Sequence, residues 1–249
     1  MRSIVCIKRV PDSEARLRIA ADGLAIDSSG VKFSMNPYDE FALEEALRLK
    51  EKFGEGSVTA VTVGPDAARE TLRSALAMGA DEGVLLRSAG SHDGLAVARA
   101  LADEIATREY DLILFGKQAI DDDGMQVPAM VAQLLSLPCA TVVVDLQIEG
   151  GTATAKREIE GGHEIVEFEL PGVVAAQKGL NEPRYPSLKG IMAAKRKPLD
   201  EKDIVMVEPK IELLALTPPP ARPEPQIVGE GADAVPELVR RLREEAKVL

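Results

Sequence analysis

The stretch that decides the fold is SVTAVTVGPDAARETLRSALAMGADEGVLL, residues 57–86. Its first seven residues form a β-branched run that ends at Gly64-Pro65. Residues 67–78 then form an amphipathic helical run closed by Gly79, and a second apolar run begins at Val84. A strand, a helix and a strand joined by turns this short predict one unit of a parallel sheet.

The same alternation continues on both sides of this unit. The expected elements are, in order, a strand at 3–10, a hairpin flap with arms at 24–26 and 31–33, a helix from Asn36 to its stop at Gly54, a helix at 95–109, a strand at 111–115, an apolar stretch at 130–135, a strand at 140–144 and an antiparallel hairpin at 152–158 and 164–170. Asn36 can cap its helix, and Pro37 fits the first turn because no N–H is needed there. The sequence therefore predicts an α/β fold with a parallel, Rossmann-like sheet and an antiparallel hairpin addition.

The C-terminal part of the chain lacks this rhythm. Residues 218–225 read PPPARPEP, which predicts an extended, polyproline-like conformation, and a last helix is expected at 236–249. Such a segment cannot form a core of its own. We therefore expect a body of residues 1–198 and an extended C-terminal arm of residues 199–249 that either hangs free or wraps around a partner.

Composition excludes several classes of protein. The 249 residues carry a net charge of -11, which argues against a partner made of nucleic acid. No run approaches the roughly 18 apolar residues that span a bilayer, so no membrane insertion is expected. The two cysteines, Cys6 and Cys139, indicate a reducing compartment, and the start of the chain resembles neither a signal nor a transit peptide. We expect a cytoplasmic protein of bacterial or archaeal type.

The loops that leave the predicted strands are the candidate ligand site. A parallel sheet binds ligands outside the carboxyl ends of its strands, where the strand order switches. Residues 116–124, GKQAIDDDG, leave the strand at 111–115 and either offer backbone N–H groups to a phosphate or form a solvated acidic turn. Asn36-Pro37 either borders a ligand or is an ordinary helix cap. The chain has no Walker loop and no GxGxxG after its first strand. His92 and His163 have no partners at metal-ligand spacing, and the chain has no catalytic triad. Neither a metal nor a catalytic residue is therefore predicted.

A second candidate site is the segment at 178–197. It mixes turn formers with Leu188, Ile191 and Met192 and carries six basic residues and one acid, a local charge of +5 that leaves -16 for the rest. It is either a solvated basic connection or a docking surface with an apolar anchor.

Three blocks of sequence resemble the β subunit of electron transfer flavoprotein, the small subunit of the ETF/Fix family. They are residues 34–40 (SMNPYDE), residues 116–123 (GKQAIDDD) and residues 180–192 (LNEPRYPSLKGIM) with 195–198 (KRKP) behind them. Smaller matches are residues 8–10 with Asp12, and residues 157–162. The resemblance covers almost the whole chain.

The resemblance implies a heterodimer that carries electrons and catalyses no reaction itself. Family members pair with an α subunit that holds most of the FAD site, and pass electrons from dehydrogenases, such as the acyl-CoA dehydrogenases of fatty acid β-oxidation, to a quinone oxidoreductase. The C-terminal arm would wrap the α subunit. Many members bind AMP in the β subunit, and the positions implied for it here are Cys6, Asn36, Pro37, Tyr38, Asp39, Val63, Ala119, Ile120, Asp121, Asp122, Asp123, Gly124, Met125, Gln126, Val127, Pro128, Ala129 and Met130.

The resemblance also assigns contacts with other proteins. Leu188 falls on the family's anchoring leucine in a recognition loop for the dehydrogenase, with Ile191 and Met192 beside it. Glu158 matches an acid that helps to hold the mobile flavin domain of the α subunit.

The chain departs from the family pattern in two places. A tyrosine that touches the flavin in the family falls on Ser13. Many AMP-binding members read Asn-Gln-Thr-Gly-Gln where this chain has residues 125–129, MQVPA. Electron-bifurcating members, which carry a second FAD instead of AMP, usually read Asp-Gly-Asp-Thr where this chain has residues 121–124, DDDG, so the triple aspartate favours AMP. A second FAD is the alternative, and a free-standing nucleotide-binding protein is a more distant one.

Overall fold

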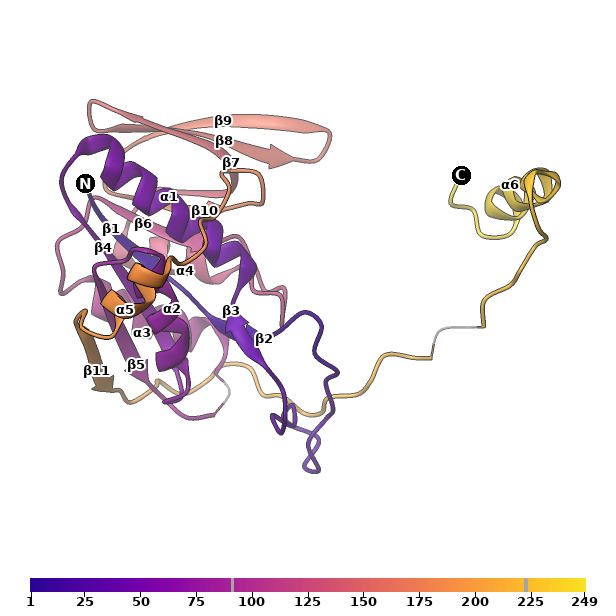
Figure 1. The fold of residues 1–249 in the computed structure, drawn as a ribbon, viewed down its shortest axis with the longest axis horizontal. Coiled ribbons are helices and arrows are strands. Elements are labelled where there is room, and N and C mark those ends of the chain that lie inside the picture. Colours follow the sequence, from indigo (N-terminus) through magenta and orange to yellow (C-terminus); the bar gives the residue numbers. More distant parts are fainter. Residues whose placement is uncertain (91, 222–223) are drawn as a thin grey trace. The chain divides into compact units, whose positions relative to one another are not determined.

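The computed structural model describes residues 1–90, 92–221 and 224–249. Contacts divide the chain into two units, Met1–Ala215 and Leu216–Leu249, which are described separately. The first unit is a twisted sheet with helices on both faces, as Figure 1 shows. Its elements are β1 (Arg2–Cys6), β2 (Arg9–Pro11), β3 (Phe33–Met35), α1 (Pro37–Phe53), β4 (Ser57–Gly64), α2 (Ala68–Met78), β5 (Glu82–Arg87), α3 (Gly94–Ile105), β6 (Leu112–Gly116), α4 (Val127–Leu135), β7 (Cys139–Glu149), β8 (Thr152–Ile159), β9 (Gly162–Glu169), β10 (Gly172–Ala176), α5 (Leu188–Ala194) and β11 (Leu199–Asp203).

The nine-stranded sheet has the order β11-β5-β4-β1-β6-β10-β7-β8-β9. All pairs from β11 to β7 are parallel, and β8 and β9 add antiparallel strands at one edge. The α/β class and the antiparallel addition predicted from the sequence are therefore confirmed.

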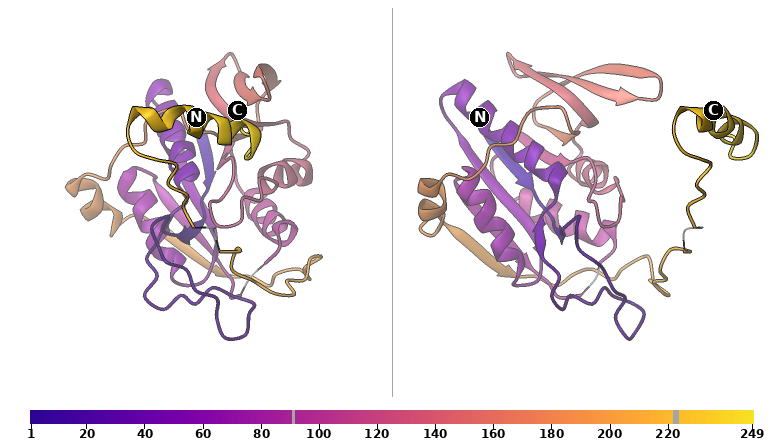
Figure 2. Two further views of the ribbon diagram at one scale, coloured as in Figure 1. Left: turned by 90° about the vertical axis from the view of Figure 1, so that its right-hand side faces the viewer. Right: turned by 45° about the vertical axis from the view of Figure 1, so that its right-hand side comes forward.

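The core lies in two layers because successive strand residues point to opposite faces. Val5 on β1 packs with Leu43 of α1 and Leu72 of α2 on one face. Ile4, its neighbour, packs with α3 and α4 on the other face. Figure 2 shows the helices on both sides of the sheet. Two covered faces explain why the central strands read as continuous apolar runs.

The N-terminal flap pairs differently from the prediction. The antiparallel pair joins β2 to β3, with Val10 opposite Ser34, and Ile19 bridges Ile26. The expected hairpin between arms at 24–26 and 31–33 is therefore wrong. The run at 3–10 also breaks into β1 and β2, because the chain leaves the sheet after Cys6 to start the flap.

Two strands of the sheet are absent from the elements predicted from the sequence. β10 lies between β6 and β7, and β11 extends the opposite edge beside β5. β11 belongs to the sheet, and the contacts divide the chain after Ala215. The boundary that we expected, after Pro198, lies before β11.

The second unit contains a short 3-10 helix, η1 (Ala232–Ala234), and the helix α6 (Val235–Glu244). Residues 216–221 and 224–228 form no helix or strand, and Arg222 and Pro223 of the predicted extended run lie outside the described residues. α6 begins one residue before the predicted position and ends five residues earlier. None of the helices in the described ranges is long and apolar enough to cross a membrane.

Candidate functional site

The sheet has its topological switch between β1 and β6. From β1 the chain runs through α1 to β4 on one side, whereas from β6 it runs through α4 to β7 on the other side. Such a switch opens a crevice outside the carboxyl ends of the two strands, which is where open α/β sheets bind ligands. Here β1 ends at Cys6 and β6 at Gly116, so this edge carries the candidate residues that follow each strand.

Asn36 joins the start of α1 to the loop after β6. Its side chain is buried, and its amide nitrogen Nδ2 donates to the backbone oxygen of Gln118 at 2.8 Å and to Asp39 Oδ1 at 2.9 Å. Its Oδ1 accepts from the backbone N–H of Ile120 at 3.2 Å. Both ends of the amide are therefore used to shape the loop, and Asn36 does not cap α1 with its side chain.

Asp39 ties the ends of both strands to the same helix. Its carboxylate accepts from the backbone N–H of Lys8, after β1, at 2.7 Å and from that of Gly116, at the end of β6, at 3.1 Å. Burial raises the pKa of Asp39 to about 7, although the hydrogen bonds from Asn36, Lys8 and Gly116 oppose that rise. Asn36 and Asp39 thus hold protein groups in place and leave ligand contacts to the loop.

The loop at 117–126 is acidic and exposed at its tip. Lys8 Nζ bridges Asp121 at 2.8 Å and Asp122 at 3.0 Å, and Gln118 donates to Asp123. Residues 121–126 are exposed. Carboxylates at this edge suit the hydroxyl groups of a ribose, as the acidic residue of dinucleotide sites does.

The N-terminus of α4 is the part of this edge that suits a phosphate. The first N–H groups of a helix have no partner inside it. In α3, which also starts here, Asp93 accepts from the backbone N–H of Ala96 and caps the end. Within the described ranges no side chain caps α4, which starts at Val127. An anion could therefore bind at α4 with less competition from the protein.

Cys6 and Val63 lie at neighbouring strand ends of the same edge. Cys6 is buried, and burial together with the charge of Asp39 raises the pKa of its thiol well above the usual value. A neutral, buried thiol is a wall of the site and not a nucleophile. Val63, on β4, is half-buried.

Two other hollows lie away from the switch point. One, of about 360 Å³, is lined by Met1, Tyr110, Asp111 and Pro171, which stand at the amino ends of the strands. Another is lined by the flap residues 12–32. In the described ranges no three His, Cys, Asp or Glu side chains gather as a metal site would need.

The predicted docking residues lie on a short helix with its apolar side chains exposed. Ser187 caps α5 by accepting from the backbone N–H of Gly190 at 3.0 Å. Leu188 is 83% exposed and Met192 72%, with Ile191 also exposed. Such side chains on a hydrogen-bonded element form a surface patch that a partner can cover.

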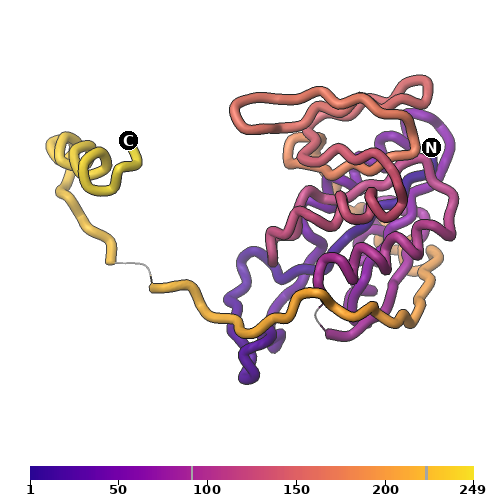
Figure 3. Tube along the Cα trace, turned by 180° about the vertical axis from the view of Figure 1, so that it is seen from behind, coloured from indigo at the N-terminus to yellow at the C-terminus, as the bar shows by residue number. Residues whose placement is uncertain are grey.

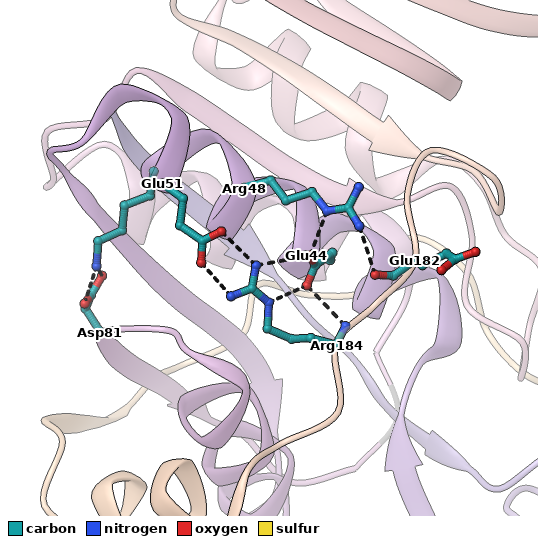
Figure 4. A network of polar contacts seen from close by, with 7 residues as sticks. Glu44, Arg48, Glu51, Asp81, Glu182 and Arg184 are labelled. Atoms are coloured by element: carbon teal, nitrogen blue, oxygen red, sulfur yellow. Dashed lines mark hydrogen bonds and ion pairs between the residues drawn. The ribbon is translucent and has the colours of Figure 1, made fainter.

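The segment before α5 is fixed to α1 by an ion-pair network that the sequence did not reveal (Figure 4). The guanidinium of Arg184 contacts Glu44 at 2.8 Å and Glu51 at 2.6 Å, and Arg48 also contacts Glu44 at 2.8 Å. The only available signal was the spacing of Glu44, Arg48 and Glu51 along one helix face.

Two of the six basic residues of this segment are therefore used inside the body. Arg184 binds α1, and Lys197 Nζ donates to the backbone oxygens of Leu76 and Ala80 at the C-terminal end of α2. The +5 charge counted from the sequence overstates the free positive charge near Leu188.

Glu158 lies near the end of β8, far along the chain from α5. Its side chain is exposed and accepts from Gln177 Nε2 at 2.8 Å. Gln177 directly follows β10, and the backbone oxygen of Ala176 accepts from the N–H of Lys117. The exposed carboxylate of Glu158 therefore lies on the side of the sheet where the loop at 117–126 begins.

Comparisons with known proteins agree on one family. The electron transfer flavoprotein domain family matches residues 23–205. Electron transfer flavoprotein subunit beta of Bradyrhizobium diazoefficiens is 43% identical, and that of Bacillus subtilis 42% identical, each over the full length of both chains. The protein of that name from Sus scrofa is 40% identical over 100% of this chain and 99% of its own. The chain therefore belongs to the electron transfer flavoprotein β-subunit family.

Proposed function

We propose that this chain binds AMP at the switch-point crevice and pairs with an α subunit that holds most of the FAD. Membership of the family supports a flavin and a partner subunit in general. The single observation that carries the AMP site is the Asn36 amide, which holds the loop at 117–126 against the carboxyl ends of β1 and β6.

The crevice offers each part of AMP a partner of suitable chemistry. The uncapped start of α4 would take the phosphate, and Asp121 or Asp122 would accept from the ribose hydroxyls. The walls at Cys6 and Val63 are apolar enough for an adenine ring. These residues supply binding and no reaction chemistry, since the carboxylate of Asp39 and the thiol of Cys6 are buried.

The flavin is proposed to lie mainly on the partner because this chain offers its crevice little aromatic surface. Tyr38 is the aromatic residue of the AMP-site block, and Lys117 Nζ lies 5.1 Å from the centre of its ring. That cation–π contact occupies one face of the ring. The FAD, when bound to the heterodimer, supplies the electron-carrying group.

We further propose that the heterodimer takes electrons from dehydrogenases, among them acyl-CoA dehydrogenases, and passes them to a quinone oxidoreductase. Leu188, Ile191 and Met192 would dock the dehydrogenase, and Glu158 would hold the mobile flavin domain of the α subunit. The arm would wrap the α subunit. The two free cysteines are in accord with a cytoplasmic location, which stays part of the proposal.

Counting nucleotides tests the proposal. The heterodimer is produced with its α subunit, denatured, and the released nucleotides are separated and quantified. We expect one FAD and one AMP per heterodimer. Two FAD and no AMP would support the bifurcating alternative, which the altered stretch at 125–129 leaves open. One FAD with no adenine nucleotide would contradict a nucleotide site in this chain.

A further inference from the structure

Exposed apolar side chains are concentrated at the C-terminal end of the chain. Of the 23 large apolar residues that are exposed in the described part of the protein, eleven lie at 205–249. In the first unit they include Ile211, Leu213 and Leu214, which follow the last strand of the sheet. We call residues 204–215 the lead segment of the arm. Exposed apolar side chains that lie close together mark a surface to which a partner binds.

The lead segment is tied to the body at two places. Directly after β11, the backbone N–H of Ile204 donates to the oxygen of Arg87 at 3.2 Å. Further on, the N–H groups of Lys210 and Ile211 both donate to one oxygen of Asp93, Oδ2, the second at 3.1 Å. In the described part of the first unit, no hydrogen bond reaches a residue beyond Ile211. Asp93 is therefore the last anchor before the arm leaves the body.

Asp93 uses its two carboxylate oxygens for different purposes. Oδ1 accepts from the backbone N–H of Ala96 at 2.7 Å and caps α3, whereas Oδ2 takes the two N–H groups of the lead segment. The hydrogen bonds from Ala96 and Lys210 lower the pKa of Asp93, so the group is charged and its hydrogen bonds are charge-assisted. A helix cap alone needs one oxygen, and serine supplies it as well. The second oxygen is what a serine would lack.

We propose that Asp93 is a positioning residue for assembly, which holds the lead segment ordered before its exposed apolar side chains (Ile211, Leu213 and Leu214) meet an apolar surface of the partner subunit. This inference rests on the proposed role of the arm in binding that subunit. A segment ordered before contact loses less conformational entropy on binding, so association is favoured without any added contact.

Two substitutions separate the cap from the anchor. Asp93→Ser keeps an oxygen for the N–H of Ala96 and removes the acceptor of the lead segment. Asp93→Ala removes both. Amide hydrogen exchange of the isolated subunit and of the heterodimer, followed by mass spectrometry, reports on the lead segment and on α3 separately, and stopped-flow mixing with the α subunit gives the association rate.

In Asp93→Ser the amides of Lys210 and Ile211 should exchange about five- to tenfold faster, as expected when a hydrogen bond of ordinary net strength is lost. Association should slow by about threefold or more, within the range that variants of one interface show. Exchange in α3 and the FAD content of the assembled heterodimer should match the wild type. Asp93→Ala should add faster exchange at the start of α3.

Unchanged exchange at Lys210 and Ile211 in Asp93→Ser would overturn the anchor itself. Faster exchange with an unchanged association rate would overturn its role in assembly. If the wild-type chain does not associate with the α subunit at all, the proposed function fails, whereas the exchange comparison still decides whether Asp93 orders the lead segment.

Discussion

Replacing Arg184 with alanine should loosen the docking segment and destabilise the whole body. The carboxylate of Glu44, whose side chain is 3% exposed, accepts from Arg184 Nε at 2.8 Å, from its Nη2 at 3.2 Å and from its backbone N–H at 3.2 Å. The substitution removes both side-chain bonds and leaves Arg48 as the remaining cation at Glu44. A nearly buried carboxylate would thus lose half of its ionic partners.

The magnitude follows from the exposure of each pair. Hydrogen bonds to charged groups contribute about 1.5–3 kcal/mol, and the Arg184 side chain is 35% exposed, which favours the lower part of that range. The pair with the exposed Glu51 adds less than about 1 kcal/mol. We expect a loss of about 2–3 kcal/mol, which for a chain of this size lowers Tm by about 4–12 °C.

Thermal denaturation of the heterodimer measures this loss, with two matched controls. Arg184→Lys keeps the charge but not the forked geometry and should lose about half as much. Glu51→Gln removes only the exposed pair and should cost less than about 1 kcal/mol. An Arg184→Ala protein whose Tm lies within a degree of the wild type would refute the assignment of the network as the anchor of the docking segment.

The same substitution has a defined pH dependence. Burial alone would raise the pKa of Glu44, but the bonds from Arg184 and Arg48 hold that pKa below its usual value. A lowered pKa means that the folded state favours the carboxylate, so this stabilisation is present above about pH 4.3, the ordinary glutamate pKa, and is lost as the pH falls through the lowered value. The difference in stability between Arg184→Ala and the wild type should therefore shrink in acid.

Three further substitutions test the crevice and the docking helix. A methyl group at Gly116 would overlap Asp39 Oδ1, so Gly116→Ala should cost about 1–3 kcal/mol and release the nucleotide. Gly162→Ala, where an added methyl group meets nothing within 4 Å, should keep the nucleotide, and equal nucleotide content in the two variants would contradict this. Burial raises the pKa of Asp39 to about 7, so ionising this carboxyl group lowers the free energy of unfolding. In urea denaturation, the wild type should therefore lose stability relative to Asp39→Asn as the pH rises from about 4 to 7. Parallel curves of stability against pH for the two proteins would count against the buried carboxylate. Leu188→Ala should slow the reduction of the heterodimer's FAD by a dehydrogenase about tenfold, with unchanged FAD content. Leu134→Ala, at another exposed leucine, should leave that rate unchanged. An unaltered rate in Leu188→Ala would rule out the docking role.

The sequence predicted the parts of the fold that have a local pattern. The run at 57–63 and the helix from Pro37 to its stop at Gly54 carry their own start and stop signals, and the structure has β4 and α1 there. The rule that strand ends share one edge of the sheet pointed to the loop after β6 as a candidate site, but it did not predict the contact of Asn36 with that loop.

The rest depends on contacts between distant parts of the chain. β11 reads LDEKD, which has no apolar alternation, because an edge strand can keep charged side chains in water. Arg184 and Glu44 are 140 residues apart, and nothing local marks them as partners. Whether Asn36 and Asp39 point toward a ligand or into the protein likewise depended on the position of Gly116, which periodicity does not give.

The central position of β10 constrains the order in which the chain can fold during synthesis. β10 pairs with β6 on one side and with β7 on the other, so it is the strand that joins the larger parallel part of the sheet to the strand that carries the hairpin. Figure 3 shows the chain passing through the hairpin region before it returns to the body. A nascent chain that has not yet emerged past Ala176 has unpaired edges on both β6 and β7, and such edges are sites of aggregation. The ribosome must therefore release more than two thirds of this chain before β10 can join the two parts of the sheet.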